Sequence, residues 1–171
     1  MARNKSPDFE AMARKIKKDA VRYASIKGVN FIQDNFHKQG FTNKAFEPWV
    51  KRKGDVDPGR KILVKSAYLL NSIRVFQANQ ERIVFGSDAA YSEIHNEGGT
   101  ITVRITSKAR RYFWFMYKKT GQERWKWMAL SRKDTMRITI PKRQFMGHSD
   151  TLMERLDEWL VNHIVKQFKQ A

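Results

Sequence analysis

The clearest change of period along the chain lies between Arg82 and Ile105. An apolar segment at 83–85 ends at Gly86, which predicts a strand followed by a turn. Residues 89–95 are long enough for about two helical turns, and Gly98-Gly99 ends them. Beyond this glycine corner polar and apolar residues alternate, which predicts a half-buried strand with one apolar face, made of Ile101, Val103 and Ile105.

Two long amphipathic helices are predicted near the ends of the chain. Ser6-Pro7-Asp8 is typical of a helix start with Ser6 as N-cap, and apolar residues then recur every three or four positions to about His37. Gly40 is the expected C-terminal stop. Ser149 is expected to cap a last helix over residues 150–169. Since the first helix is long for a small domain, we expect part of it to pack on a neighbouring subunit.

Shorter elements are predicted between these helices. Residues 41–60 are polar and irregular, which predicts a loop anchored by Phe46 and Trp49, with a mobile part at 50–60. A short strand or turn and then a helical turn follow at 60–70. The next segments form a hairpin of 72–78 with 82–85, and alternation predicts strands around Trp125 and Trp127 and at Met136, Ile138 and Ile140, the last stopped by Pro141.

These elements predict a single α+β domain over residues 1–171. We expect a small, mostly antiparallel sheet whose alternating faces are covered by the long N-terminal and C-terminal helices, because an amphipathic helix must bury its apolar stripe against another element. The length of 171 residues fits one domain with a core of its own.

Composition adds a strong basic charge to this picture. The chain has 34 Lys and Arg against 17 Asp and Glu, a net charge of +17. Residues 104–143 hold 13 basic residues and 2 acidic ones, so +11 of that charge is local. Such a field favours polyanions or acidic protein surfaces. The chain has no cysteine, no signal peptide is expected, and no apolar run approaches the roughly 20 residues of a membrane span.

The same segment is rich in aromatic residues. Five of them lie between 112 and 117, and neither a helix nor a strand can bury them all on one face of a monomer. Arginine beside aromatic residues is typical of protein interfaces and also of DNA contacts. We favour a protein interface and keep nonspecific DNA binding through 104–143 as the alternative. The candidate interface residues are Arg110, Arg111, Tyr112, Phe113, Trp114, Tyr117, Trp125 and Trp127.

Catalytic and metal-binding motifs do not emerge from the sequence. His95, Glu93 and Glu97 are too closely spaced on a short helix to converge on a metal, and no Cys pair or HExxH motif is present. His95 is expected to bond to backbone near the glycine corner, and Asp88 to be the N-cap of the helix after it. We expect no catalytic residue, cofactor or metal. A hydrolase that uses His95 with a nearby carboxylate remains a third hypothesis.

Four blocks of the chain resemble one known family. FGSDAAYSEIHNEGG at 85–99 is similar to the signature G-S-(D/x)-x-x-Y-(A/S)-x-I-H-(N/Q)-x-G-G of the phage virion morphogenesis family, the Mu-type tail completion proteins. NFHKQGF with Trp49, RKILVKSAYLLNSI and IPKRQFMGHS extend the resemblance. Ala67-Tyr68 departs from the usual glycine and polar residue. The signature residues are Phe36, Gly40, Phe41, Trp49, Gly86, Ser87, Tyr91, Ile94, His95, Gly98, Gly99, Pro141, Arg143, Phe145 and Gly147.

This resemblance implies a structural, non-enzymatic protein of a phage or prophage. It implies tail completion or head-to-tail joining by a homo-oligomer, most simply a hexameric ring. The implied partners are the tail tube, tail terminator or neck and connector proteins, without a membrane. The implied location is the host cytoplasm during assembly and the tail or neck of the finished virion.

Overall fold

The computed structural model describes residues 8–52 and 59–170. This part of the chain contains six helices and three antiparallel pairs of strands, which confirms the α+β class. In chain order the elements are α1 (Phe9–Lys38), β1 (Gly40–Thr42), β2 (Phe46–Pro48), α2 (Tyr68–Asn71), β3 (Ile73–Ala78), β4 (Ile83–Ser87), α3 (Ser92–Glu97), β5 (Gly99–Arg104), α4 (Ser107–Thr120), α5 (Glu123–Leu130), β6 (Thr135–Ile140) and α6 (Asp150–Lys169).

Helix α1 ends differently from the prediction. Asp8 is its N-cap and accepts a hydrogen bond from the backbone N of Ala11 at 2.9 Å, while the expected cap Ser6 lies outside the described residues. At the other end Gln39, with φ of 62°, takes the left-handed conformation that was expected of Gly40. Gly40 instead starts β1, where a Cβ would lie 2.5 Å from the carbonyl oxygen of Glu47. The glycine is therefore required by close packing and not by helix termination.

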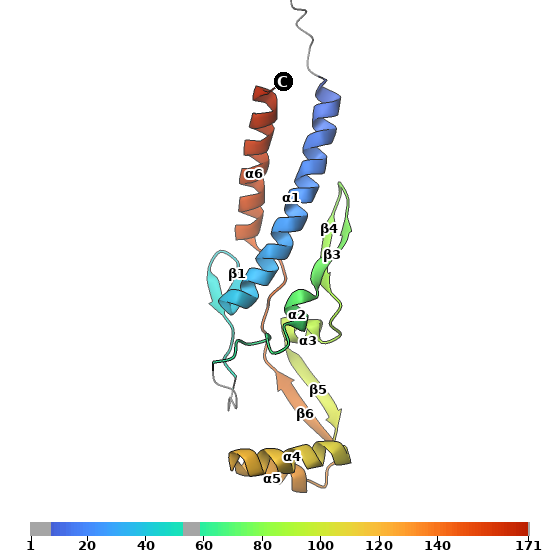
Figure 1. The fold of residues 1–171 in the computed structure, drawn as a ribbon, viewed down its shortest axis with the longest axis vertical. Helices are drawn as coiled ribbons and strands as arrows, with labels where there is room; N and C mark the ends of the chain where they lie inside the picture. The colour runs from blue at the N-terminus through green and yellow to red at the C-terminus, as the bar shows by residue number, and fades with distance from the viewer. Residues whose placement is uncertain (1–7, 53–58, 171) are drawn as a thin grey trace, which may run out of the picture.

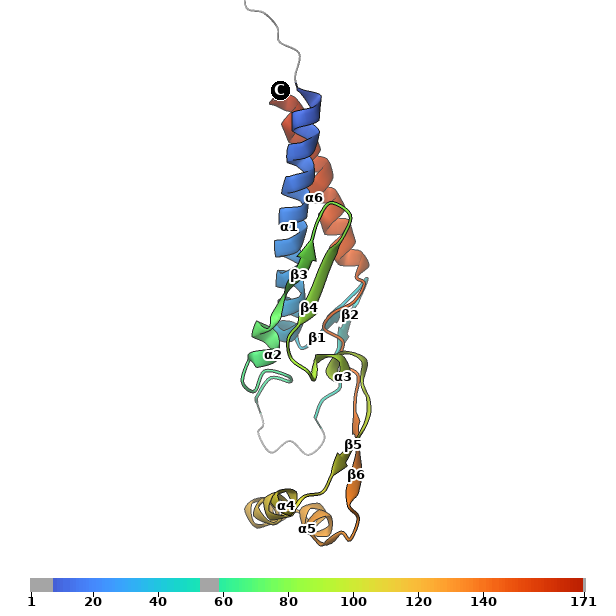
Figure 2. The ribbon, with the colours of Figure 1, turned by 90° about the vertical axis from the view of Figure 1, so that its right-hand side faces the viewer.

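Helices α1 and α6 pack against each other as an antiparallel pair (Figures 1 and 2). The rings of Tyr23 and Trp159 stack at 3.9 Å, and Nε2 of His163 lies 3.1 Å from the carboxylate of Asp19. Ser149 caps α6 as predicted, by accepting a hydrogen bond from the backbone N of Leu152 at 3.2 Å. The apolar stripe of α6 therefore packs on α1, and near its start Leu152 and Leu156 line a groove shared with the strand that contains Phe85.

The expected single sheet is absent from the described residues, where the strands form three separate hairpins. The hairpin β3–β4 confirms the predicted pairing of 72–78 with 82–85. The pair β1–β2 corrects the predicted loop at 41–60, and the mobile part expected at 50–60 lies largely outside the described residues. In the region 60–70 a turn at 62–63 is followed by the short helix α2, as predicted, and the N-cap Ala67 of α2 has a φ of 55°.

The core lies under the C-terminal half of α1. Its buried residues come from α1, α2, β3 and the segments beside them, and they are Ile32, Phe36, Trp49, Leu69, Leu70, Ile73, Ala89 and Phe145. Gly28 lets α1 approach the hairpin β3–β4, since a Cβ there would lie 2.1 Å from the ring of Phe85. Helix α1 also covers β1, where Phe41 is buried and meets the ring of Phe31 edge-on at 6.4 Å, so of the three strand pairs β5–β6 is the one that lies away from the long helices.

The hairpin β5–β6 projects away from the core and carries α4 and α5 at its far end (Figures 1 and 2). We call β5–β6 the stalk, α4 with α5 the head, and the remaining described residues the body. The strands pair in register from Gly99 with Ile140 to Arg104 with Thr135. The predicted strand is present, and on its apolar face Ile101 and Val103 are 36% and 37% exposed while Ile105 is half-buried, although none of these residues belongs to the buried core.

The head is a helical hairpin and corrects the strand predicted around Trp125 and Trp127. Thr106 caps α4 by accepting a hydrogen bond from the backbone N of Ala109, and Gly121, with φ of 67°, ends α4 in the left-handed conformation. The period of α4 places Phe113 and Met116 against α5, where Ala129 is also buried. Trp125 and Trp127 are two positions apart, which fits an alternating strand. The segment is instead a helix whose inner face packs on α4, and this face contains Trp125 but not Trp127.

Candidate interaction surface

The signature residues gather where the stalk leaves the body. The backbone N of Arg143 donates to the carbonyl oxygen of His95 at 2.9 Å, which joins α3 to the segment after β6. Oδ1 of Asn96 accepts hydrogen bonds from the backbone N of Phe145 and of Met146, both at 2.9 Å. The amide of Asn35 in α1 donates to the carbonyl oxygen of Phe145 at 3.1 Å. Three distant segments are thereby held at one junction.

An aromatic cluster fills this junction. Phe36 and Phe145 are fully buried, with ring centroids 4.8 Å apart, and the ring of Trp49 meets Phe36 edge-on at 5.5 Å. Nε1 of Trp49 donates to the carbonyl oxygen of Gln144 at 2.7 Å. The guanidinium of Arg143 donates twice to the carbonyl oxygen of Val50, at 3.2 and 3.1 Å. The indole of Trp49 and the guanidinium of Arg143 therefore satisfy backbone carbonyl oxygens and help to build a scaffold.

The glycine corner, Gly98-Gly99, is the point where the chain passes from α3 into the stalk. Gly98 has a φ of 73°, and a Cβ on it would lie 2.6 Å from the backbone N of Lys142. Only glycine fits both the left-handed backbone and this close approach. At Gly99 a Cβ would lie 2.9 Å from the side chain of Ile94. The corner thus brings α3, β5 and the residues after β6 into direct contact.

His95 is the signature residue with the most unusual environment. Its Nδ1 is buried and has no hydrogen-bond partner among the described residues, so the expected ring bond to backbone is not made by that nitrogen. Burial, and then the charge of Arg143, lowers the pKa of His95 below its usual value. The ring packs edge-on against Tyr91 at 5.8 Å. It faces an opening of about 220 Å³.

Cationic and apolar groups surround that opening, which the described residues line without a carboxylate: Arg52, Arg60, Lys61, Leu63, Lys65, Ser66, Leu69, Tyr91 and His95. Among residues 8–52 and 59–170 no three His, Asp or Glu side chains form a metal-binding group. Asp88 is not the helix cap that was predicted: it pairs with Arg74 at 2.6 Å, and Tyr91 occupies the N-cap position. Among the described residues that line this opening, no Asp or Glu supplies the carboxylate that a hydrolase using His95 would need.

The head divides the candidate interface residues into two groups. Phe113 and Trp125 stack inside it at 6.1 Å, and Arg110 donates hydrogen bonds to the carbonyl oxygens of Ala129, Ser131 and Lys133, so these side chains hold α4 to α5. Tyr117 donates to the carboxylate of Glu123 at 3.0 Å. The exposed members are Arg111, Tyr112, Trp114 and Trp127.

Two exposed apolar residues of the head were missed by the sequence analysis. Phe115 is 58% exposed and Leu130 is 52% exposed, although both belong to helices whose other face is buried. A helical interpretation of 107–120 would have found Phe115, because it lies opposite Phe113 on the wheel. The head thus displays a group of large apolar side chains at its surface, together with Tyr112, Trp114 and Trp127.

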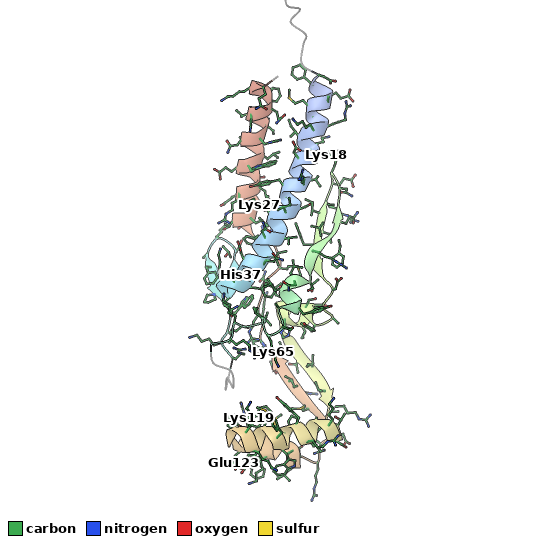
Figure 3. All side chains as sticks on the ribbon, in the orientation of Figure 1. Lys18, Lys27, His37, Lys65, Lys119 and Glu123 are labelled. Carbon is green, nitrogen blue, oxygen red and sulfur yellow. The ribbon has the colours of Figure 1, made fainter. Side chains whose placement is uncertain are left out.

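Unpaired cations surround these apolar side chains. Lys108, Arg111, Lys118 and Lys119 are exposed, and none forms an ion pair within the described part of the chain. Figure 3 shows Lys119 and Glu123 on the head, at the opposite end of the molecule from Lys18 on α1. The ion pair found inside the described head joins Lys126 to Glu123 at 3.5 Å. The head is therefore both apolar and strongly basic.

A scaffold built on a buried aromatic junction, with an exposed apolar and basic head, defines an α+β assembly protein. The model of the phage virion morphogenesis family matches residues 4–165, so the chain belongs to this family. Searches of curated proteins and of solved structures found no match. The protein therefore has a structural or assembly role in a phage virion. Within the described residues, every helix is too short or too polar to cross a lipid bilayer.

Proposed function

We propose that the protein completes the tail or joins the head to the tail of a phage or prophage particle, as a ring of identical copies. The observation that carries this proposal is the exposed head on its stalk. Trp127 is 65% exposed and Phe115 is 58% exposed. Both belong to the head, which lies at the far end of the stalk, away from the body (Figure 1). Large exposed apolar groups rimmed by charge are typical of binding surfaces.

Ring formation is consistent with this shape. A heterologous contact, repeated about an axis, closes a ring and leaves its upper and lower faces free for different partners. The tail tube, tail terminator or connector proteins are the proposed partners, and six is the proposed number of copies because tails have that symmetry. Assembly would occur in the host cytoplasm, and the protein would remain in the tail or neck of the virion. No catalytic step is required for this role.

Inactivating the gene in a complete phage or prophage genome tests the proposal. We expect electron microscopy to show filled heads and separate tails in place of joined particles, and a copy supplied in trans to restore infectivity. A copy with Phe115→Ser and Trp127→Ser should fold but fail to restore it. Tyr68→Ser, which changes an exposed residue of the body, is the matched control. Normal yields of infectious particles without the gene would contradict the proposed function.

Nonspecific DNA binding is the second candidate, favoured by the unpaired cations of the head. Counterion release predicts that log affinity falls against log salt with a slope of about −0.9 per neutralised phosphate. Replacing Lys118 and Lys119 with Gln should then reduce the slope by about two such units. The control is Lys17→Gln with Lys18→Gln on α1. A defined oligomer that shows no retention on DNA at low salt would exclude this candidate.

A further inference from the structure

The outward face of α6 carries a cluster of three of the 17 acidic residues in this basic protein. Glu154, Asp157 and Glu158 lie on one stripe with Val161 and Val165, at the spacing i, i+3, i+4, i+7 and i+11. The opposite stripe of the helix packs on α1 through Trp159 and His163. All five outward residues are exposed, Val161 by 60%. The three carboxylates form no ion pair within the described chain.

The outward face of α4 has the same spacing and the opposite charge. Lys108, Arg111, Tyr112, Phe115 and Lys119 also lie at i, i+3, i+4, i+7 and i+11, and all are exposed. At about 1.5 Å per residue each stripe is roughly 17 Å long. In α4 the apolar residues Tyr112 and Phe115 lie between cations, whereas in α6 the carboxylates occupy the N-terminal part of the stripe and the two valines its C-terminal part. The two helix faces are therefore complementary in charge, in spacing and in length.

These two faces cannot meet within one molecule. The head lies beyond the stalk, at the end of the molecule opposite to α6 in both views (Figures 1 and 2). A contact of α4 with α4 would place cations against cations, and a contact of α6 with α6 would place carboxylates against carboxylates. Like-charge contacts of this kind suppress wrong pairings. Of these three pairings, only a contact between the α4 face of one copy and the α6 face of another places cations against carboxylates.

We infer that the outward face of α4 in one copy docks on the outward face of α6 in the next copy. The contact is heterologous, so each copy uses both faces and the assembly continues from copy to copy until a ring closes. Phe115 lies against the valines of α6, and Lys108 and Arg111 face carboxylates. This inference rests on the proposed ring and names the surfaces that would build it. The ion pairs select the partner and its orientation, and the apolar residues are the anchors.

Disulfide trapping tests the contact directly, because the chain has no cysteine of its own. Lys119→Cys and Val165→Cys, at the C-terminal ends of the two stripes, are made as separate proteins, mixed, and oxidised mildly, so that Phe115 and Val161 stay in place. We expect a mixed disulfide dimer from the pair, and little dimer from either variant alone. A chain with both substitutions should give a ladder of longer products, since each copy then offers one cysteine on each face. Tyr68→Cys mixed with Val165→Cys is the control.

Charge reversal supplies a second, independent measurement. Lys108→Glu with Arg111→Glu should lower the yield of trapped dimer about tenfold or more, because like charges then face each other. Glu154→Lys with Asp157→Lys should do the same. Mixing the α4-reversed protein with the α6-reversed protein should restore the yield. Folding of each variant is checked by circular dichroism, since all four residues are exposed.

Three outcomes would overturn the inference. The first is equal trapping by the single variants and by their mixture. The second is a mixture of the two reversed proteins that fails to restore trapping. The third is an α4-reversed protein that loses retention on DNA while its mass by light scattering stays that of the unchanged oligomer, which would assign the face to nucleic acid. The gene-inactivation experiment measures joined and infectious particles independently of this contact. Absence of the contact would therefore contradict this inference but not the proposed virion role.

Discussion

The substitution Phe36→Ala tests whether the aromatic junction stabilises the whole body. Phe36 is fully buried between the rings of Trp49 and Phe145, at 5.5 and 4.8 Å. Truncation removes the transfer free energy of the ring and leaves a cavity, a combined loss of about 3–5 kcal/mol in the free energy of unfolding. For a domain of this size each kcal/mol corresponds to roughly 2–4 °C, so the melting temperature should fall by about 6–20 °C.

Urea unfolding followed by far-ultraviolet circular dichroism measures this loss. The slope m should stay unchanged while the midpoint falls, because the surface exposed on unfolding is nearly the same. Tyr68→Ala is the control, since an exposed aromatic residue should change the free energy by about 0.5 kcal/mol or less. A loss below about 1 kcal/mol for Phe36→Ala, at constant m, would refute the assignment of the core to this junction.

Three further predictions concern the glycine corner, the half-buried His95 and the head. Gly98→Ala should lower the urea midpoint well beyond Gly121→Ala, because both have positive φ but only Gly98 has a backbone atom within 3 Å of the new Cβ. The lowered pKa of His95 means that the unfolded chain takes up the proton first, so stability should fall as the pH drops below about 6.5. His95→Gln should flatten that part of the urea midpoint profile, and an unchanged profile would contradict the assignment. Replacing residues 105–134 with an Asn-Gly turn should leave the midpoint of the body unchanged, since Arg104 and Thr135 are already paired across the stalk. Loss of the cooperative transition in that shortened chain would show that the head supports the body.

Local pattern predicted the elements whose signals lie within a few residues. The start of α6 at its Ser149 cap, the hairpin β3–β4 and the strand β6 before Pro141 all follow from capping, turn and alternation rules. The resemblance to the phage virion morphogenesis family was also available from sequence and is confirmed by the family model. These features depend on neighbouring residues, which a single sequence displays directly.

Local pattern failed where two interpretations fit the same residues. Trp125 and Trp127 alternate as in a strand, but the packing of α5 on α4 selects a helix. Asp88 fits a helix cap by position, yet Arg74 across the hairpin takes its carboxylate. Gln39 occupies the left-handed position expected of Gly40. In each case a residue distant in sequence decided between alternatives of similar local energy.

The sequence by itself determined the α+β class, the two end helices, the basic charge of 104–143 and the family. Tertiary structure decided that Asn35 and Phe145, 110 positions apart, share one buried junction, and that β5 lies outside the core because it is part of a stalk. It also decided which aromatic residues of the head face outward. The burial of a residue depends on which distant segments of the folded chain pack against it. The periodicity of the sequence does not contain that information.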